Sequence, residues 1–102
     1  MLTLTIKKKW FDMICSGEKK EEYREISQYY FRRFARYLGR QTINGEKKRD
    51  EFFCRLRNGY DIASPSIIVR CTVSVGTGKP EWGAELGKRY YVLKILGFET
   101  ER

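Results

Sequence analysis

The chain has 102 residues, of which 41% are hydrophobic and 15% aromatic, so it is too apolar for a disordered chain and has the size of one folded domain, residues 1–102. Its 21 Lys and Arg residues against 13 Asp and Glu residues give a net charge of +8, which makes nucleic acid the first partner to consider. The absence of histidine excludes Ser-His-Asp triads, Cys-His pairs and histidine-based metal sites.

The cysteines and the hydropathy pattern indicate a reducing compartment. Cys15, Cys54 and Cys71 are odd in number and lack C-x-x-C spacing, so we expect reduced, buried thiols and neither disulfides nor a zinc site. No apolar stretch reaches the ~18 residues that a membrane span requires, and the first residues do not resemble a targeting signal. We therefore expect a cytoplasmic protein with no metal, no cofactor and no membrane partner, either a monomer or a weak dimer.

The N-terminal pattern predicts a strand followed by a helix. Within residues 1–6, apolar Leu2, Leu4 and Ile6 alternate with Thr3 and Thr5, as in a half-buried strand. From Lys8 to Ser16 the apolar residues follow helical spacing, and Gly17 stands where a helix stops. Lys8 and its two neighbouring lysines lie near the positive end of the helix dipole, so a bound anion such as phosphate would relieve their repulsion.

The segment "SGEKKEEYRE", residues 16–25, carries eight ionisable side chains and is either a solvated surface or a ligand site. Propensity does not decide between helix and extended chain for residues 21–25. The extended alternative would put Glu22 and Arg24 on one face and Glu21 and Tyr23 on the other.

Residues 27–39 predict a second helix, with Ser27 as N-cap and Gly39 as its C-terminal stop. The predicted core face of this helix carries Tyr30, Phe31, Phe34, Tyr37 and Leu38. The opposite face carries Arg32, Arg33, Arg36 and Arg40. This arginine face is either simply solvated or a surface for phosphates, which guanidinium groups bind in bidentate fashion.

The remaining residues predict a loop and three strands. Residues 41–50 have one apolar side chain and an Asn-Gly pair, so we expect a mobile loop. Residues 51–59 form a strand that ends at Asn58-Gly59, residues 66–75 form a strand with one buried face that Gly76 interrupts, and residues 89–98 form the last strand. This order predicts an α+β domain whose strands curl into a small barrel.

One spaced motif connects the charged segment to a known family. Gly17, Lys19, Glu22 and Arg24 spell G-x-K-x-x-E-x-R directly after the predicted helix, which resembles the signature of the ASCH domain family. Further segments that resemble bacterial and phage members are "KKWFDMICSGEKKEEYREIS" at 8–27, "NGY" at 58–60, "SPSI" at 64–67 and "PEWGAE" at 80–85. The resemblance runs through essentially the whole chain in order.

The resemblance implies a PUA-like small β-barrel with two or three helices and a cleft that binds RNA or a modified nucleoside. Some relatives are hydrolases that remove an acetyl group from acetylcytidine, with a lysine in the place of Lys19 and a threonine where Glu22 stands here. Others are ribonucleases. By this resemblance Lys19 and Glu22 are the candidate catalytic residues.

The residue chemistry favours binding over lysine nucleophilicity. Lys19, Glu22 and Arg24 together suit a ligand that carries negative charge and a hydrogen-bond donor, such as a nucleotide. A nucleophilic lysine needs a lowered pKa, which Glu22 opposes. The alternatives are a hydrolase that acts on an acylated nucleoside or an RNA phosphodiester, and an adaptor that binds a partner through the basic surface.

Four further side chains are candidate ligand contacts, each with a structural alternative. Tyr23, Tyr60 and Trp82 can stack on a base or pack in the core. Glu85 can accept a hydrogen bond from the amino edge of cytosine or remain a surface carboxylate. The candidate phosphate contacts are Lys8, Arg32, Arg33 and Arg36.

Overall fold

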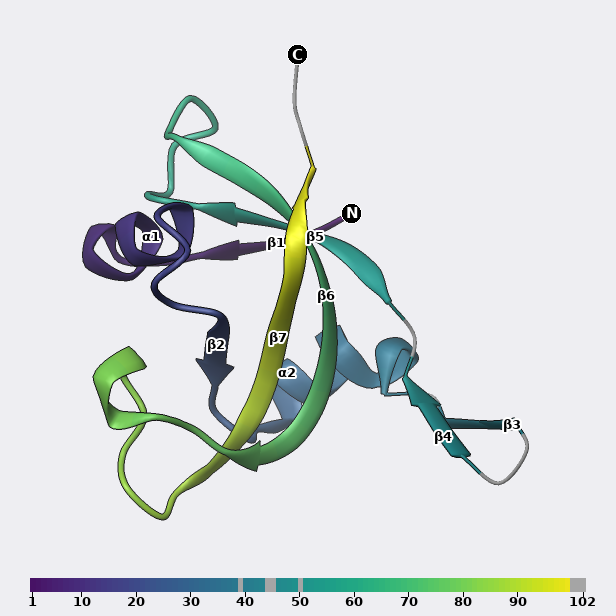
Figure 1. Cartoon of the computed structure of the whole chain (residues 1–102). Helices are drawn as coiled ribbons and strands as arrows, with labels where there is room; N and C mark the ends of the chain where they lie inside the picture. Colours follow the sequence, from purple (N-terminus) through teal and green to yellow (C-terminus); the bar gives the residue numbers. More distant parts are fainter. Residues whose placement is uncertain (39, 44–45, 50, 100–102) are drawn as a thin grey trace.

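A computed structural model describes residues 1–38, 40–43, 46–49 and 51–99, with the backbone alone for residues 40–43 and 46–49. It shows a small α+β fold with a strongly curled five-stranded sheet that closes about half a barrel (Figure 1). The strands of this sheet are β1 (Leu2–Thr5), β2 (Glu21–Arg24), β5 (Phe52–Arg57), β6 (Ser66–Thr77) and β7 (Arg89–Glu99). The α+β prediction is therefore confirmed in this coarse form.

The strand order β1-β5-β6-β7-β2 makes β1 and β2 the two edges of the sheet. β1 pairs with β5 in parallel, and the other neighbours are antiparallel. The long strands β6 and β7 bend together (Figure 1), and their register shifts between Arg70 and Cys71, as at a bulge that sharpens a bend. This curvature turns the two edge strands toward each other.

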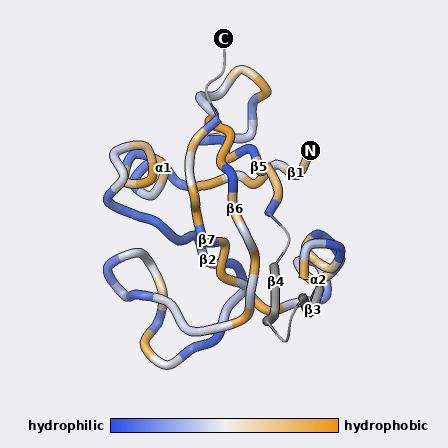
Figure 2. Tube along the Cα trace, turned by 45° about the vertical axis from the view of Figure 1, so that its right-hand side comes forward, coloured by the Kyte–Doolittle hydropathy of each residue, from blue (hydrophilic) through white to orange (hydrophobic). Residues whose placement is uncertain are grey.

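The first helix forms where the apolar spacing predicts it. α1 (Lys8–Cys15) buries Phe11 and Ile14 against the sheet. Gly17, just beyond the helix, has φ of +84°, a conformation that glycine adopts without strain. The connection from α1 to β2 is mostly hydrophilic (Figure 2), and Lys19 lies on it.

The extended alternative for residues 21–25 is the observed one, because β2 pairs with β7 through Glu22 opposite Leu93 and Arg24 opposite Tyr91. The predicted division of side chains between the two faces of this strand is confirmed as well. The Arg24 guanidinium contacts the Glu22 carboxylate, and the Tyr23 hydroxyl donates to Glu21.

The second helical segment begins at the predicted N-cap and changes type before its end. α2 (Gln28–Phe34) begins at Ser27, whose hydroxyl accepts from the Tyr30 amide, and it tightens into the 3-10 helix η1 (Ala35–Tyr37). Phe34 is fully buried, but Phe31 is 51% exposed, so its place in the predicted core is wrong. The i, i+4 pair of Tyr30 and Phe34 faces the sheet, and at ~100° per residue Phe31 points to the side.

The prediction of a loop at residues 41–50 is wrong, because β3 (Arg40–Ile43) and β4 (Glu46–Arg49) form an antiparallel pair. This pair projects away from the curled sheet (Figure 1). Its sequence has no alternating apolar face, so the backbone pairing leaves no hydropathy signal. The predicted stop at Gly39 and the Asn-Gly pair at 44–45 lie outside the described residues.

The core lies inside the curl, where side chains from β1, β5, β6 and β7 meet the two helices, and hydrophobic residues recur along these strands (Figure 2). Cys54 and Cys71 are buried there as predicted, whereas Cys15 at the end of α1 is exposed, so its predicted burial is wrong.

β6 runs through Gly76 to Thr77 and therefore continues past its predicted end. Its last part extends beyond the core, which leaves Val75 exposed. No helix in the described parts of the chain is long and apolar enough to cross a membrane.

Candidate ligand-binding site

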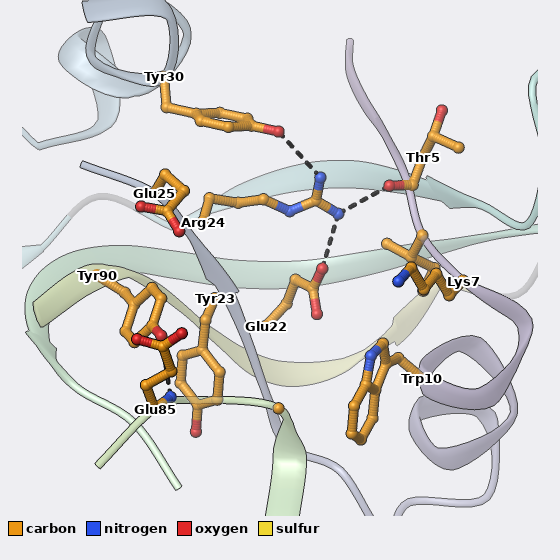
Figure 3. Close-up of a pocket in the computed structure, with 12 residues that line it drawn as sticks. Thr5, Lys7, Trp10, Glu22, Tyr23, Arg24, Glu25, Tyr30, Glu85 and Tyr90 are labelled. Carbon is orange, nitrogen blue, oxygen red and sulfur yellow. Dashed lines mark hydrogen bonds and ion pairs between the residues drawn. The ribbon is translucent and has the colours of Figure 1, made fainter. Parts of the chain in front are cut away.

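A cavity of about 380 Å³, here called the main cavity, lies where the edge strands β1 and β2 meet the start of α1. Its aromatic lining residues are Trp10, Tyr23, Tyr30 and Tyr90. Its charged lining residues are Lys7, Glu22, Arg24, Glu25 and Glu85. In Figure 3, Trp10 from α1 and Tyr23 from β2 lie on either side of Glu22.

Glu22 is held between two cations in the wall of this cavity. Its Oε2 atom lies 2.7 Å from Nη2 of Arg24, and its Oε1 atom lies 3.3 Å from Nζ of Lys19. Glu22 is only 6% exposed, so both ion pairs are shielded from water. A carboxylate offers about four lone-pair sites, and these two contacts leave acceptor capacity that can face the cavity.

Arg24 connects the two edges of the sheet. From β2, its Nη2 atom also donates to the carbonyl of Thr5 in β1 at 2.9 Å, and its Nη1 atom donates to the hydroxyl of Tyr30 at 3.1 Å (Figure 3). Burial acts to lower the pKa of Arg24, but the Glu22 carboxylate and the Tyr30 hydroxyl outweigh it, so the net shift is upward. The guanidinium is thus a fixed, charged part of the cavity wall.

Lys19 lies behind the wall instead of lining the main cavity. It is 2% exposed, and its Nζ atom donates to the carbonyl of Trp82 at 2.5 Å. The same atom lies 4.9 Å from the ring centres of both Trp10 and Tyr23, which are cation-π contacts. Burial lowers the pKa of Lys19, and Glu22 works against that shift. The lysine therefore acts on the cavity through Glu22 and the two rings.

Tyr23 is fixed in place by its hydroxyl group. The hydroxyl donates to Glu21 at 2.8 Å and accepts from the backbone amide of Lys79 at 2.9 Å. Burial raises the pKa of Tyr23 well above its ordinary value, with Glu21 adding to the shift. Its ring is also packed tightly, because a Cβ atom on Gly78 would lie 2.5 Å from it. The ring therefore offers the main cavity a rigid aromatic face.

A second cavity of about 220 Å³ adjoins the main one, and the two share Thr5, Arg24 and Tyr30 as lining residues. Tyr60, which the sequence predicts as a ligand contact, lines this second cavity and is 93% exposed. Arg33, a predicted phosphate contact, lines it as well.

The other predicted contacts are distributed as follows. Glu85 lines the main cavity. Trp82 is half-buried and contributes its carbonyl to Lys19, while its ring contacts Lys79 and does not line the main cavity. Lys8 is exposed and pairs with Asp12 at 2.6 Å.

The arginines of the second helical segment do not form one stripe. Arg32 and Arg36 are exposed and line neither cavity. Arg33 is half-buried because its Nη2 atom donates to the carbonyl of Thr3 in β1 at 2.7 Å. The side chain of Arg40 is outside the described part of the structure.

Several lining residues were not identified from the sequence as ligand contacts. Trp10 and Tyr30 read as core positions because they share the apolar spacing of their helices, yet both line the main cavity. Glu25 and Tyr90 also line it, as does Lys7, one of the three lysines beside which an anion is expected from the sequence. The one sequence signal for the place of Trp10 and Tyr30 at the cavity is their side-chain chemistry, since Trp and Tyr carry a polar atom that suits the border between core and solvent.

Within the described residues, no group of three or more Cys, Asp and Glu side chains is placed to hold a metal ion. Comparison of the chain with models of protein families, with curated proteins and with solved structures finds no match.

Proposed function

We propose that this protein is an ASCH-type domain with a PUA-like fold that binds RNA or a nucleotide-derived ligand, with the base in the main cavity. The motif residues Lys19, Glu22 and Arg24, far from forming a solvated surface, lie together at one concave site. Their arrangement and the aromatic lining support the proposal.

The observation that carries the proposal is the shielded carboxylate of Glu22 beside aromatic rings. Two cations hold it in place, so it can accept a hydrogen bond without reorganising. The exocyclic amino group of cytosine is a donor that suits such an acceptor. Trp10 and Tyr23 flank the carboxylate (Figure 3) and offer ring faces on which a base can stack.

Hydrolysis by Lys19 is less well supported than binding. The lowered pKa of Lys19 favours a nucleophile, but its ammonium is bonded to Trp82 and Glu22 and does not line the main cavity. An attacking amine needs a free lone pair within reach of the substrate. We therefore assign Lys19 a positioning role in ligand binding.

The test is calorimetric titration of the protein with cytidine and uridine. The wild type should prefer cytidine, because uridine presents a carbonyl oxygen to Glu22 where cytidine presents a donor. Glu22→Gln should weaken cytidine binding about tenfold or more and remove the preference, since a neutral amide can donate as well as accept.

Glu18→Gln is the matched control, because Glu18 is exposed and lines neither the main nor the second cavity. It should leave binding of both nucleosides unchanged. The proposal fails if the wild type binds no nucleoside, nucleotide or RNA, or if Glu22→Gln binds cytidine as the wild type does.

A further inference from the structure

We propose that the second cavity holds the phosphate group of the same ligand, so that the natural ligand is a phosphorylated nucleoside, as a free nucleotide or within an RNA strand. This inference rests on the proposed function, because it places the base in the main cavity. It assigns a site to the phosphate and thereby narrows the ligand class.

The two cavities are neighbours on one continuous surface. Thr5, Arg24 and Tyr30 line both, so the Arg24 guanidinium and the Tyr30 ring form the border between them. A ligand with a base in one cavity and a phosphate in the other would cross this border. Arg24 would then be the side chain that contacts both halves of the ligand.

The charged side chains that line the two cavities differ. The main cavity has two cationic lining residues, Lys7 and Arg24, against the three carboxylates of Glu22, Glu25 and Glu85. The second cavity has Arg24 and Arg33, and no carboxylate lines it among the residues that the structure describes. Although Lys19 and Lys88 pair with Glu22 and Glu25, a phosphate in the main cavity would still lie beside carboxylates, whereas in the second cavity it would meet two guanidinium groups and none of the described carboxylates.

The uncompensated charge near the second cavity matches a phosphate. Lys19, Glu22 and Arg24 form a group of two cations and one anion, which leaves one positive charge. Arg33 adds another, because no carboxylate of the described residues forms an ion pair with it. A phosphate monoester carries ≈ −1.5 to −2 at neutral pH and would neutralise this excess.

Arg33 is positioned to donate. Its Nη2 atom is bonded to the Thr3 carbonyl at 2.7 Å and its Nη1 atom to the Tyr29 hydroxyl at 3.3 Å. A guanidinium has five N–H donors, and each of these nitrogens has a second N–H available for a phosphate oxygen. The bond to Thr3 also fixes the side chain in advance, which reduces the entropy lost on binding.

Two exposed aromatic rings border the second cavity. Tyr29 is 61% exposed and Tyr60 is 93% exposed. Tyr60 lies on an ordered turn, where the Asn58 amide donates to Pro65 and the Ser64 amide donates to Asp61. An exposed ring next to a phosphate site is a platform for the neighbouring base of a strand.

The experiment measures dissociation constants by calorimetry for cytidine, cytidine 5′-monophosphate, cytidine 3′-monophosphate and a short oligocytidylate. In the wild type, a phosphorylated ligand should bind at least tenfold more tightly than cytidine. Arg33→Gln should lower this ratio severalfold, because it removes one of the two guanidinium groups that line the second cavity. Arg36→Gln, on the same helical segment but lining neither cavity, should leave the ratio as in the wild type.

Salt provides a second measurement that needs no variant. Raising ionic strength should weaken binding of the phosphorylated ligands and lower the ratio, while cytidine affinity changes little. If the oligocytidylate binds more tightly than the mononucleotides and Tyr60→Ala removes this difference, the natural ligand is an RNA strand. If the mononucleotide and the oligonucleotide bind with equal affinity, the natural ligand is a free nucleotide.

The outcomes separate the two proposals. If cytidine binds but no phosphorylated form binds more tightly, the phosphate site is wrong and the proposed function stands. If the ratio is high yet unaffected by both Arg33→Gln and salt, the phosphate lies elsewhere. If neither cytidine nor any nucleotide binds, the proposed function itself is wrong.

Discussion

A buried lysine charge is expensive unless its surroundings replace water, and the surroundings of Lys19 do so with three kinds of partner. The Trp82 carbonyl accepts one N–H, the Glu22 carboxylate supplies an opposite charge, and the rings of Trp10 and Tyr23 supply electron-rich faces. These partners come from three separate segments of the chain: α1, β2 and the segment that carries Trp82. The ammonium therefore joins the parts that build the main cavity.

Lys19→Met tests this stabilising role. The methionine would fill similar space but leave the Trp82 carbonyl without its donor and Glu22 with Arg24 as its remaining cation. We expect the free energy of unfolding to fall by about 3 kcal/mol, as for a broken buried ion pair. Urea denaturation measures the change.

Lys20→Met is the matched control, because Lys20 is the next residue and is exposed. Its effect should stay within ~0.5 kcal/mol. Equal stability of the two variants would mean that the buried ammonium contributes nothing to the fold.

At the scale of secondary-structure elements, β2 and the turn after β6 pack closely against each other. The Tyr23 hydroxyl accepts from the Lys79 amide, and its ring occupies the space in which Gly78 would carry a side chain. The turn therefore sets the position of the Tyr23 ring, and the ring in turn lines the main cavity.

Gly78→Ala should displace that ring, since the added Cβ atom would lie 2.5 Å from it. We expect a loss of about 1–3 kcal/mol in unfolding free energy, typical of overpacking, together with weaker cytidine binding. Gly76→Ala is the control, because nothing lies within 4 Å of a Cβ atom there. Thermal denaturation measures the stability of both variants, and calorimetry measures their cytidine binding. If Gly78→Ala equals Gly76→Ala in both measurements, the Tyr23 ring can move freely and the prediction is wrong.

The elements differ in how far the sequence predicts them. The alternation of β1 and β6 and the helical spacing of α1 are local patterns with one buried face, so each can be recognised without its partner. β2 could not be assigned, because its four residues become a strand by pairing with β7 near the other end of the chain. β3 and β4 were missed because their pairing involves no apolar pattern.

In the candidate site, too, the residues that are close together in the sequence could be predicted and the others could not. Lys19, Glu22 and Arg24 were predicted together because they follow one another closely in the sequence. Trp10 and Tyr30 from the two flanking helices and Gly83 from much later in the chain line the main cavity beside Glu22 and Arg24, and only the fold places them there. The arginine face was predicted from helical angles alone, which cannot show that Arg33 reaches the Thr3 carbonyl.

For the molecule as a whole, the two buried thiols predict a loss of stability in alkali. Burial raises the pKa of Cys54 and of Cys71 to about 12, from an ordinary value of 9.0. Between these values the unfolded chain has lost thiol protons that the folded protein keeps. Unfolding then releases protons, so rising pH favours the unfolded state by about 1.4 kcal/mol per pH unit for each thiol.

The measurement is urea denaturation at several pH values above 9, for the wild type and for the double variant Cys54→Ala, Cys71→Ala. The variant should lose stability less steeply with pH, whatever its stability at neutral pH. Lys19 and Tyr23 also titrate in alkali, but both proteins contain them, so the difference in slope isolates the thiols. Parallel slopes would contradict the prediction.

The two arginines that donate to β1 have a consequence for self-association. An edge strand presents unpaired carbonyl groups that can recruit a strand from another chain, which is a common start of aggregation. In β1, the carbonyls of Thr3 and Thr5 are already occupied by Arg33 and Arg24. A second copy would have to displace two guanidinium groups before it could add a strand here. The side chains proposed to hold a phosphate thus also keep this edge from serving as a template.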